Sequence, residues 1–189
     1  MPCDRFKHHR RSIRLPTYDY TSVGAYFVTL CVHGGECQLG EVVDEEMQLN
    51  EWGQIAWECW QAIPEHFDHV EPDVFVIMPN HVHGIVTIAG TVGAQHAAPP
   101  PQPQANVRPG SLGAIVRSYK SAVTKRINRL RDTPGVPFWQ RNYWEHVIRN
   151  ERSLLRIREY IQNNPARWPE DQLHPSAPPN RFNQWHASP

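Results

Sequence analysis

The chain has 189 residues, of which 40% are hydrophobic, and its seven tryptophans supply large apolar surfaces for a core. This length favours a single domain over residues 1–189, and no stretch is apolar for the length that a membrane span requires. The N-terminus also lacks the hydrophobic region of a signal peptide, so we expect a cytoplasmic protein.

The formal net charge is zero, but the charges are segregated along the chain. Residues 1–14 carry five Lys or Arg against one Asp, and residues 15–107 carry twelve Asp or Glu and no Lys or Arg. Residues 108–167 carry thirteen Lys or Arg against four Asp or Glu. The two basic segments would attract a polyanion such as nucleic acid. Solvated helix faces are the alternative explanation.

Residues 1–23 form a basic, turn-rich arm, and the first strand pattern follows at residues 24–33. Residues 37–47 could return as its hairpin partner. Helical spacing of apolar residues predicts a helix over 50–63, with Asn50 as its N-cap and Pro64 ending it. Cys31, His33 and Cys37 lie close together in the sequence. They lack an evident fourth ligand, so we interpret them as packing residues and not as a zinc site.

The most informative stretch is residues 75–88, where two runs rich in β-branched residues flank Pro79-Asn80. This pattern predicts a hairpin whose second strand begins near His81. Because side chains alternate along a strand, His81 and His83 should point to the same side. Two imidazoles on a stiff backbone are half of a metal site. The alternative is that they merely decorate a polar strand face.

Residues 91–110 are rich in Pro, Ala, Gln and Gly. This composition predicts an extended loop inserted within the domain. Ser111 then begins a long helix to about residue 131, with an apolar stripe on one side and basic residues away from it. Residues 136–148 predict a strand in which aromatic and β-branched residues are interleaved with Gln140, Arg141 and Asn142. Such residues can stack bases and pair phosphates, but we expect Trp139 or Trp144 individually to lie in the core.

The last helix should begin after Asn150, cover residues 151 to about 163, and end because Pro165 follows. Tyr160 and Asn164 are four residues apart and therefore share one flank of this helix. It could set a phenol and a carboxamide beside His81 and His83, which would supply a nucleophile and a third ligand. The remaining residues 169–189 read as a polar C-terminal tail.

At these motifs the sequence resembles the single-tyrosine HUH transposases, and among them the REP-associated tyrosine transposases. The resemblance covers most of residues 10–168, interrupted by the Pro-rich loop. The segments that carry it are Met78–His83 with its His-hydrophobe-His motif, Phe138–Arg141 with Glu145-His146, and Glu159–Pro165.

The resemblance implies an α+β fold: a ferredoxin-like antiparallel sheet with helices packed on one face. It implies that Tyr160 attacks DNA and leaves a 5'-phosphotyrosine and a free 3'-OH. His81 and His83 would bind a divalent metal, and Asn164 would be a further ligand. Tyr143 is a rival nucleophile, but it lies on a predicted strand and lacks the paired amide.

Two histidines and one asparagine are neutral ligands, so they leave the full charge of a divalent ion for a phosphate. Magnesium prefers oxygen ligands and imidazole suits softer ions, so we expect Mg2+ or Mn2+. The expected substrate is single-stranded or hairpin DNA, bound by a monomer or homodimer. The predicted DNA-binding residues are Arg10, Arg11, Arg14, Arg117, Lys120, Lys125 and Arg141.

The resulting hypothesis is a metal-dependent enzyme of DNA transposition that cleaves and transfers strands. A non-catalytic single-stranded or hairpin DNA-binding protein derived from such an enzyme is the main alternative. A small-molecule metallohydrolase would fit the metal ligands. It would explain neither the charge segregation nor the paired tyrosine.

Overall fold

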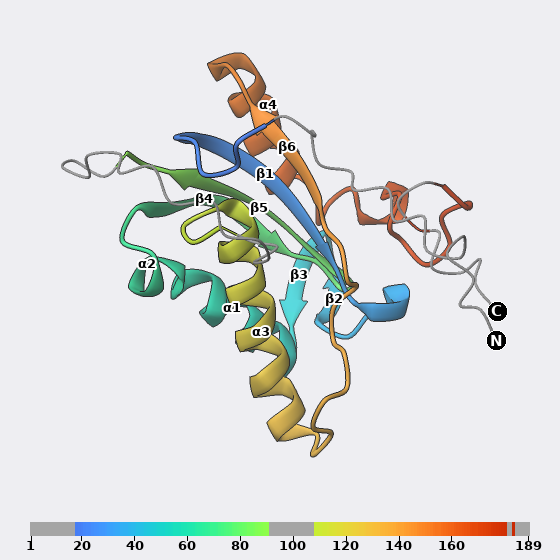
Figure 1. The fold of residues 1–189 in the computed structure, drawn as a ribbon. Coiled ribbons are helices and arrows are strands. Elements are labelled where there is room, and N and C mark those ends of the chain that lie inside the picture. Colours follow the sequence, from blue (N-terminus) through green and yellow to red (C-terminus); the bar gives the residue numbers. More distant parts are fainter. Residues whose placement is uncertain (1–17, 91–107, 181–182, 184–189) are drawn as a thin grey trace, which may run out of the picture.

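The computed structural model describes residues 18–90, 108–180 and 183, and its centre is an antiparallel sheet in the order β4-β5-β1-β6 (Figure 1). The four strands are β1 (Gly24–Cys31), β4 (Val70–Ile77), β5 (His81–Ile88) and β6 (Trp144–Ile148). Between them the chain forms α1 (Glu51–Gln61), the short α2 (Ile63–His66) and α3 (Leu112–Leu130). This β-α-β-β-α-β arrangement confirms the expected α+β class with a ferredoxin-like sheet.

One face of the sheet, called here the core face, is covered by α1 and α3 (Figure 1). Alternate residues of β1, namely Tyr26, Val28 and Leu30, point to this side and are completely buried. Gly84 of β5 also faces it, and a Cβ there would lie 2.3 Å from a ring carbon of Trp60. The glycine therefore lets α1 pack closely against the middle of the sheet.

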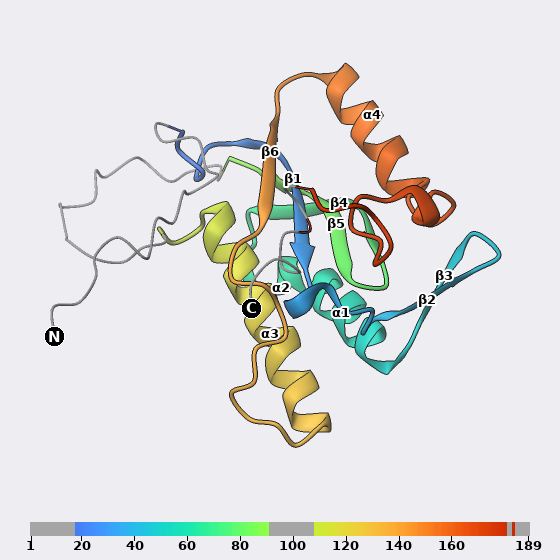
Figure 2. The ribbon, with the colours of Figure 1, turned by 90° about the vertical axis from the view of Figure 1, so that its right-hand side faces the viewer.

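The opposite face, called here the site face, is covered in part by α4 (Glu151–Gln162), which contacts β4, β5 and β6 (Figures 1 and 2). The prediction that helices lie on one face holds for α1 and α3, but it is wrong for α4. The reason is that α4 follows the last strand of the sheet and is not a connection between two strands. It turns back over the side that α1 and α3 leave open.

The helix starts follow the predicted capping pattern. Asn50 accepts hydrogen bonds from the backbone of Trp52 and Gly53, and Ser111 accepts one from Ala114. Asn150 accepts one from the backbone of Ser153 and so begins α4. Among the described residues, no helix has the combination of length and hydrophobicity that crossing a bilayer requires.

The segment 37–47 does not pair with β1 as expected. Instead β2 (Gly40–Val43) and β3 (Glu46–Leu49) form a separate hairpin that extends away from the main sheet (Figure 2). A strand has only two edges, and β5 and β6 already occupy both edges of β1. The hairpin therefore has no free edge of β1 on which to continue.

The strand predicted over 136–148 is shorter than expected, because only β6 (Trp144–Ile148) joins the sheet. Phe138 and Trp139 are instead buried in the core, and Trp139 makes a single bridge to Val32. Residues 1–17 of the predicted arm and residues 91–107 of the predicted loop lie outside the described residues.

Candidate metal centre and tyrosine

Two histidines of β5 lie next to each other on the site face. The strand register places His83 opposite Thr29 and His81 opposite Cys31 of β1. His81 is completely buried, and 3% of the His83 surface is exposed. The centroids of the two imidazole rings are 4.4 Å apart. The alternation of side chains along the strand thus brings both imidazoles into one buried position.

The preceding residue, Asn80, fixes which nitrogen of His81 carries the proton. The Asn80 Nδ2 group donates to the carbonyl oxygens of Gly35 (3.0 Å) and Leu173 (2.7 Å), so its Oδ1 must face the other way. That oxygen lies 2.8 Å from His81 Nδ1, and an amide oxygen can only accept, so Nδ1 must be the donor. The lone pair of His81 therefore lies on Nε2. This buried atom has no hydrogen-bond partner among the described residues.

Replacing Asn80 by Ala should weaken Mn2+ binding by about 10- to 100-fold, because His81 loses the acceptor that orients its ring. Asn80→Asp is the matched variant, since a carboxylate oxygen can still accept from Nδ1 while the two donated bonds are lost. Isothermal titration with Mn2+ should therefore rank wild type and Asn80→Asp above Asn80→Ala. Thermal melts of both variants show whether they remain folded. Equal affinity in wild type and Asn80→Ala would mean that the ring orientation does not depend on Asn80.

Tyr160 of α4 lies against His83, and its hydroxyl is 3.1 Å from His83 Nε2. On the other side of the ring, His83 Nδ1 is hydrogen-bonded to the Thr29 hydroxyl at 2.8 Å. The Tyr160 ring also makes an edge contact with Phe27, and the residue is 41% exposed. The phenol therefore combines a fixed contact with the imidazole and access from solvent.

Two residues within one helical turn of Tyr160 hold α4 against the sheet. Ile161 is completely buried against the sheet, and Arg158 donates two hydrogen bonds to the Asp73 carboxylate on β4, at 3.0 and 2.6 Å. The structure thus brings the phenol to the paired imidazoles, and Tyr160 and His83 lie 77 residues apart in sequence. This juxtaposition was a prediction from the sequence, because Tyr160 and Asn164 share one flank of the helix and could lie beside the histidines.

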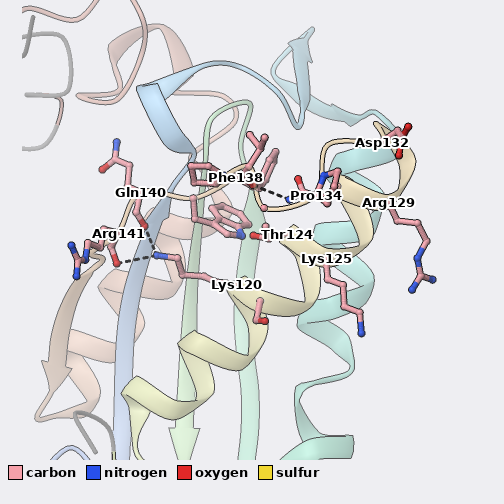
Figure 3. A pocket seen from close by; sticks show the side chains of 15 residues that line it. Lys120, Thr124, Lys125, Arg129, Asp132, Pro134, Phe138, Gln140 and Arg141 are labelled. Atoms are coloured by element: carbon pink, nitrogen blue, oxygen red, sulfur yellow. Dashed lines mark hydrogen bonds between the residues drawn. The ribbon is translucent and has the colours of Figure 1, made fainter.

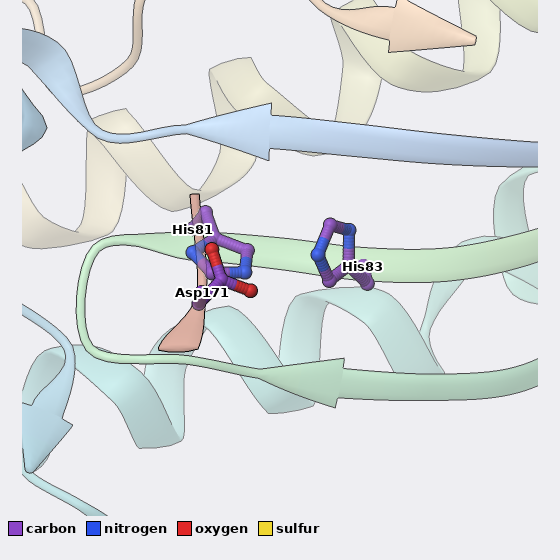
Figure 4. A group of neighbouring side chains, drawn as sticks. All are labelled: His81, His83 and Asp171. Atoms are coloured by element: carbon purple, nitrogen blue, oxygen red, sulfur yellow. The ribbon is translucent and has the colours of Figure 1, made fainter. Parts of the chain in front are cut away.

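Two further oxygen-bearing side chains lie at the same place. Asn164 is 2% exposed and donates from Nδ2 to Asp171 Oδ2 at 3.2 Å. Its Oδ1 atom is shielded from solvent and has no hydrogen-bond partner among the described residues. One ligand atom each of His81, His83 and Asp171 lies within 4.8 Å of the others, and Figure 4 shows these three side chains together.

Burial controls the protonation states of these groups. It lowers the pKa of His81 to about 3, with the nearby Asn164 amide opposing part of the effect. Burial lowers the pKa of His83 well below its usual value, and the neighbouring His81 adds to this. Burial, followed by the negative charge of Asp171, raises the pKa of Tyr160 to about 12. At neutral pH the metal-free site therefore holds two neutral imidazoles and a protonated phenol.

The metal-free protein should become less stable as the pH falls from 6.5. The folded state keeps His81 neutral down to about pH 3, whereas the unfolded chain protonates it near its ordinary value of 6.5. In that window the unfolded state binds more protons, so acid favours unfolding. His81 alone should cost about 2–3 kcal/mol of unfolding free energy between about pH 6.5 and pH 4.5.

Urea unfolding in a chelating buffer at several pH values measures this loss. His81→Gln should remove the His81 share of the loss and leave that of His83, while His33→Ala, which removes an exposed imidazole, should leave the profile unchanged. A wild-type stability that stays constant from about pH 6.5 to 4.5 would show that His81 is protonated in the fold.

The side chains present fit a divalent cation. The unpartnered His81 Nε2 and Asn164 Oδ1 are buried polar atoms that would be costly to leave without a ligand. His81 and His83 would hold the ion, together with an oxygen of Asp171 or Asn164. Mn2+ accepts imidazole and carboxylate ligands alike, and Mg2+ favours the oxygens.

Asp171 was not predicted to be a site residue, because residues 169–189 read as a polar tail. The tail is tied down instead, since Trp168 and Leu173 are 8% and 5% exposed and the Leu173 carbonyl accepts from Asn80. Trp168, just before this segment, and Leu173 within it were the available signal. They indicate that the chain after α4 packs against the fold and can bring a carboxylate with it.

The predicted DNA-binding residues divide into three groups. Arg10, Arg11 and Arg14 lie outside the described residues. Arg117, Lys125 and Arg141 are exposed, and Lys125 and Arg141 line a pocket of about 810 Å³ beside α3 (Figure 3). Lys120 lines it too, but its ammonium donates to the backbone carbonyls of Gln140, Arg141 and Asn142. Since α3 covers the core face, this helix lies across the sheet from Tyr160.

The other candidates from the sequence are one tyrosine, two tryptophans and two cysteines, and of these Cys31 lies opposite His81 on β1. Tyr143, the rival nucleophile, packs half-buried against the hydrophobic core. Trp139 is buried as expected, whereas Trp144 is only half-buried. Cys31 is buried and Cys37 is exposed, so the packing interpretation holds for Cys31 only.

Comparison with known proteins gives one close relative. An uncharacterized protein of Haemophilus influenzae is 46% identical over 172 residues, covering 88% of this chain and 94% of the relative. The chain belongs to the same family as this Haemophilus protein. No protein-family model matches the sequence.

This chain shares its fold with a solved structure. The structure of a REP-associated tyrosine transposase bound to a REP hairpin superposes with a TM-score of 0.57. The match covers 82% of this chain and 74% of that one, at 20% sequence identity. The antiparallel α+β sheet implied by the sequence resemblance is therefore observed, with α4 on the other face.

Proposed function

We propose that this chain is a metal-dependent DNA strand transferase of the cytoplasm that acts on single-stranded or hairpin DNA through a 5'-phosphotyrosine. The observation that carries the proposal is the Tyr160 hydroxyl 3.1 Å from His83, in a cluster that offers two imidazoles and a carboxylate. The REP hairpin in the solved structure with the same fold supports DNA as the substrate class.

The reaction is a transesterification at phosphorus. The Tyr160 oxygen forms a bond to the scissile phosphorus as its proton is lost, and the bond from phosphorus to the 3' oxygen breaks. The leaving 3' oxygen takes up a proton and becomes a free 3'-OH. Because the number of ester bonds is unchanged, a second 3'-OH can reverse the step and join a new strand without ATP.

The residues of the site divide this task. His81 and His83, with an oxygen of Asp171 or Asn164, would hold a divalent ion, Mg2+ or Mn2+. When bound, that ion supplies positive charge that offsets the charge of the phosphate. Tyr160 supplies the nucleophilic oxygen. The buried Ile161 and the ion pair of Arg158 with Asp73 hold α4 so that this oxygen lies near the imidazoles, which reduces the entropy lost on attack.

The hydrogen bond between Tyr160 and His83 belongs to the metal-free state. A neutral imidazole has one ring nitrogen with a lone pair, so His83 Nε2 cannot accept from the phenol and bind a metal at the same time. His83 would therefore offer Nε2 to a divalent ion only with the Tyr160 hydroxyl moved away from that atom. The 41% exposure of Tyr160 leaves room for that movement.

The decisive experiment is a denaturing gel with a 5'-labelled or 3'-labelled hairpin oligonucleotide, with and without Mn2+. The proposal expects a protein-linked product that carries the label on the 3' side of the break, and that depends on the metal. Binding without any covalent product would favour the non-catalytic DNA-binding alternative. Hydrolysis of small phosphoesters without attachment would favour a metallohydrolase.

A further inference from the structure

A further pocket lies at the outer edge of β6, between this strand and the first turns of α4, and Tyr20 and Val147 from the core side also line it. Its volume is about 390 Å³, and its lining includes His146 and Arg149 from the β6 side and Asn150, Ser153 and Arg156 from α4. None of these residues was among the predicted DNA contacts. We call this site the β6–α4 pocket.

The β6–α4 pocket carries unbalanced positive charge. Arg149 and Arg156 are exposed, and no ion pair within the described part of the chain includes either of them. Glu145 also lines the pocket, but its carboxylate oxygens are shielded from solvent. Its register partner is the fully buried Val28, so the Glu145 side chain points toward the core face. An anion entering the pocket would therefore meet two guanidinium groups.

The pocket adjoins the reactive tyrosine. Arg156 precedes Tyr160 by four residues on α4, so both lie on one flank of the helix, about 5–6 Å apart along it. Arg152, one turn further back, is also exposed on that flank. On the sheet, His146 lies opposite Phe27, whose ring contacts both His83 and Tyr160. A continuous surface thus leads from the tyrosine to the pocket.

We propose that the β6–α4 pocket binds the phosphates of the single strand next to the phosphate that Tyr160 attacks. This assignment rests on the proposed function, because it treats Tyr160 as the nucleophile. The occupant is a single strand, since about 390 Å³ is at the small end of ligand sites and accommodates one or two nucleotides. Two arginines hold phosphates through charge-assisted hydrogen bonds, and the amino end of α4 adds favourable electrostatics.

The test is the affinity of the full chain for a fluorescein-labelled oligothymidylate of about 12 nucleotides, measured by anisotropy over about 50–200 mM NaCl. The variants are Arg149→Ala, Arg156→Ala, the double variant, and Arg156→Lys, which keeps the charge. Arg129→Ala is the matched control, because it removes an exposed arginine from α3 across the sheet. Circular dichroism melts of each variant verify that the fold is intact.

The double variant should bind about 10-fold more weakly, and the slope of log affinity against log salt should fall by about 1.4, or about 0.7 per lost phosphate contact. Arg156→Lys should recover part of the affinity, and Arg129→Ala should match wild type. The proposal is overturned if the double variant behaves like Arg129→Ala, or if the wild-type chain does not bind the oligothymidylate.

Covalent attachment is read separately on the same variants. If binding depends on Arg149 and Arg156 but no protein forms a phosphotyrosine, the pocket assignment stands and the transferase proposal fails. If attachment is normal while the arginine substitutions leave affinity and salt slope unchanged, the transferase proposal stands and the pocket assignment fails.

Discussion

Replacing Tyr160 by Phe should abolish covalent attachment to a labelled single-stranded or hairpin oligonucleotide while leaving DNA binding within about twofold of wild type. The phenylalanine keeps the edge contact with Phe27 and removes only the oxygen that would bond to phosphorus. Loss of a nucleophile removes the covalent pathway entirely, so the expected fall in attachment is at least about 10⁴-fold. The measurement is a denaturing gel with Mn2+, beside an anisotropy titration of the same protein.

Tyr143→Phe is the control, since Tyr143 is the other tyrosine that the sequence offered and it packs against the core. It should retain attachment. The Tyr160→Phe protein should also bind Mn2+ at least as tightly as wild type, because its His83 Nε2 no longer contacts a hydroxyl. Attachment that survives Tyr160→Phe would remove Tyr160 from the nucleophile role and assign the covalent step to another side chain.

The parts of the site that sequence reasoning found are those governed by local periodicity. The alternation of β5 is enough to place His81 and His83 on one side, and helical spacing is enough to place Tyr160 and Asn164 on one flank. Both elements have strong end signals, Pro79-Asn80 before the strand and the Asn150 cap before the helix. Local rules of this kind do not depend on where the element sits in the fold.

Features that depend on long-range contacts could not be found in the same way. Asp171 reaches the histidines only because the tail is held by the buried Trp168 and by the bond from Asn80 to the Leu173 carbonyl. No periodic pattern encodes such a tether. The side of the sheet taken by α4 was likewise undetermined, since an amphipathic helix can cover either face. Arg149 and Arg156 were not predicted, because they line one pocket only when α4 packs on the site face of the sheet.

His81→Ala should weaken Mn2+ binding by more than about 100-fold and remove metal-dependent attachment with it. The reason lies in the environment of His81 Nε2, a buried lone pair that lacks a hydrogen-bond partner within the described residues. The ring is already oriented by Asn80 and is neutral at working pH, because burial lowers its pKa to about 3. His81 itself therefore needs neither to lose a proton nor to turn its ring before it binds a cation.

The control for this prediction is His33→Ala, which removes an exposed imidazole and should leave the Mn2+ affinity unchanged. Asp171→Asn and Asn164→Ala then distinguish the two possible oxygen ligands by titration calorimetry. Loss of the Asp171 charge should have the larger effect, since a carboxylate attracts a divalent ion more strongly than an amide does. If Asp171 is a ligand, the bound site keeps about one positive charge for the phosphate instead of two. Metal affinity and attachment that remain normal in His81→Ala would separate the buried histidine pair from the chemistry and limit it to packing.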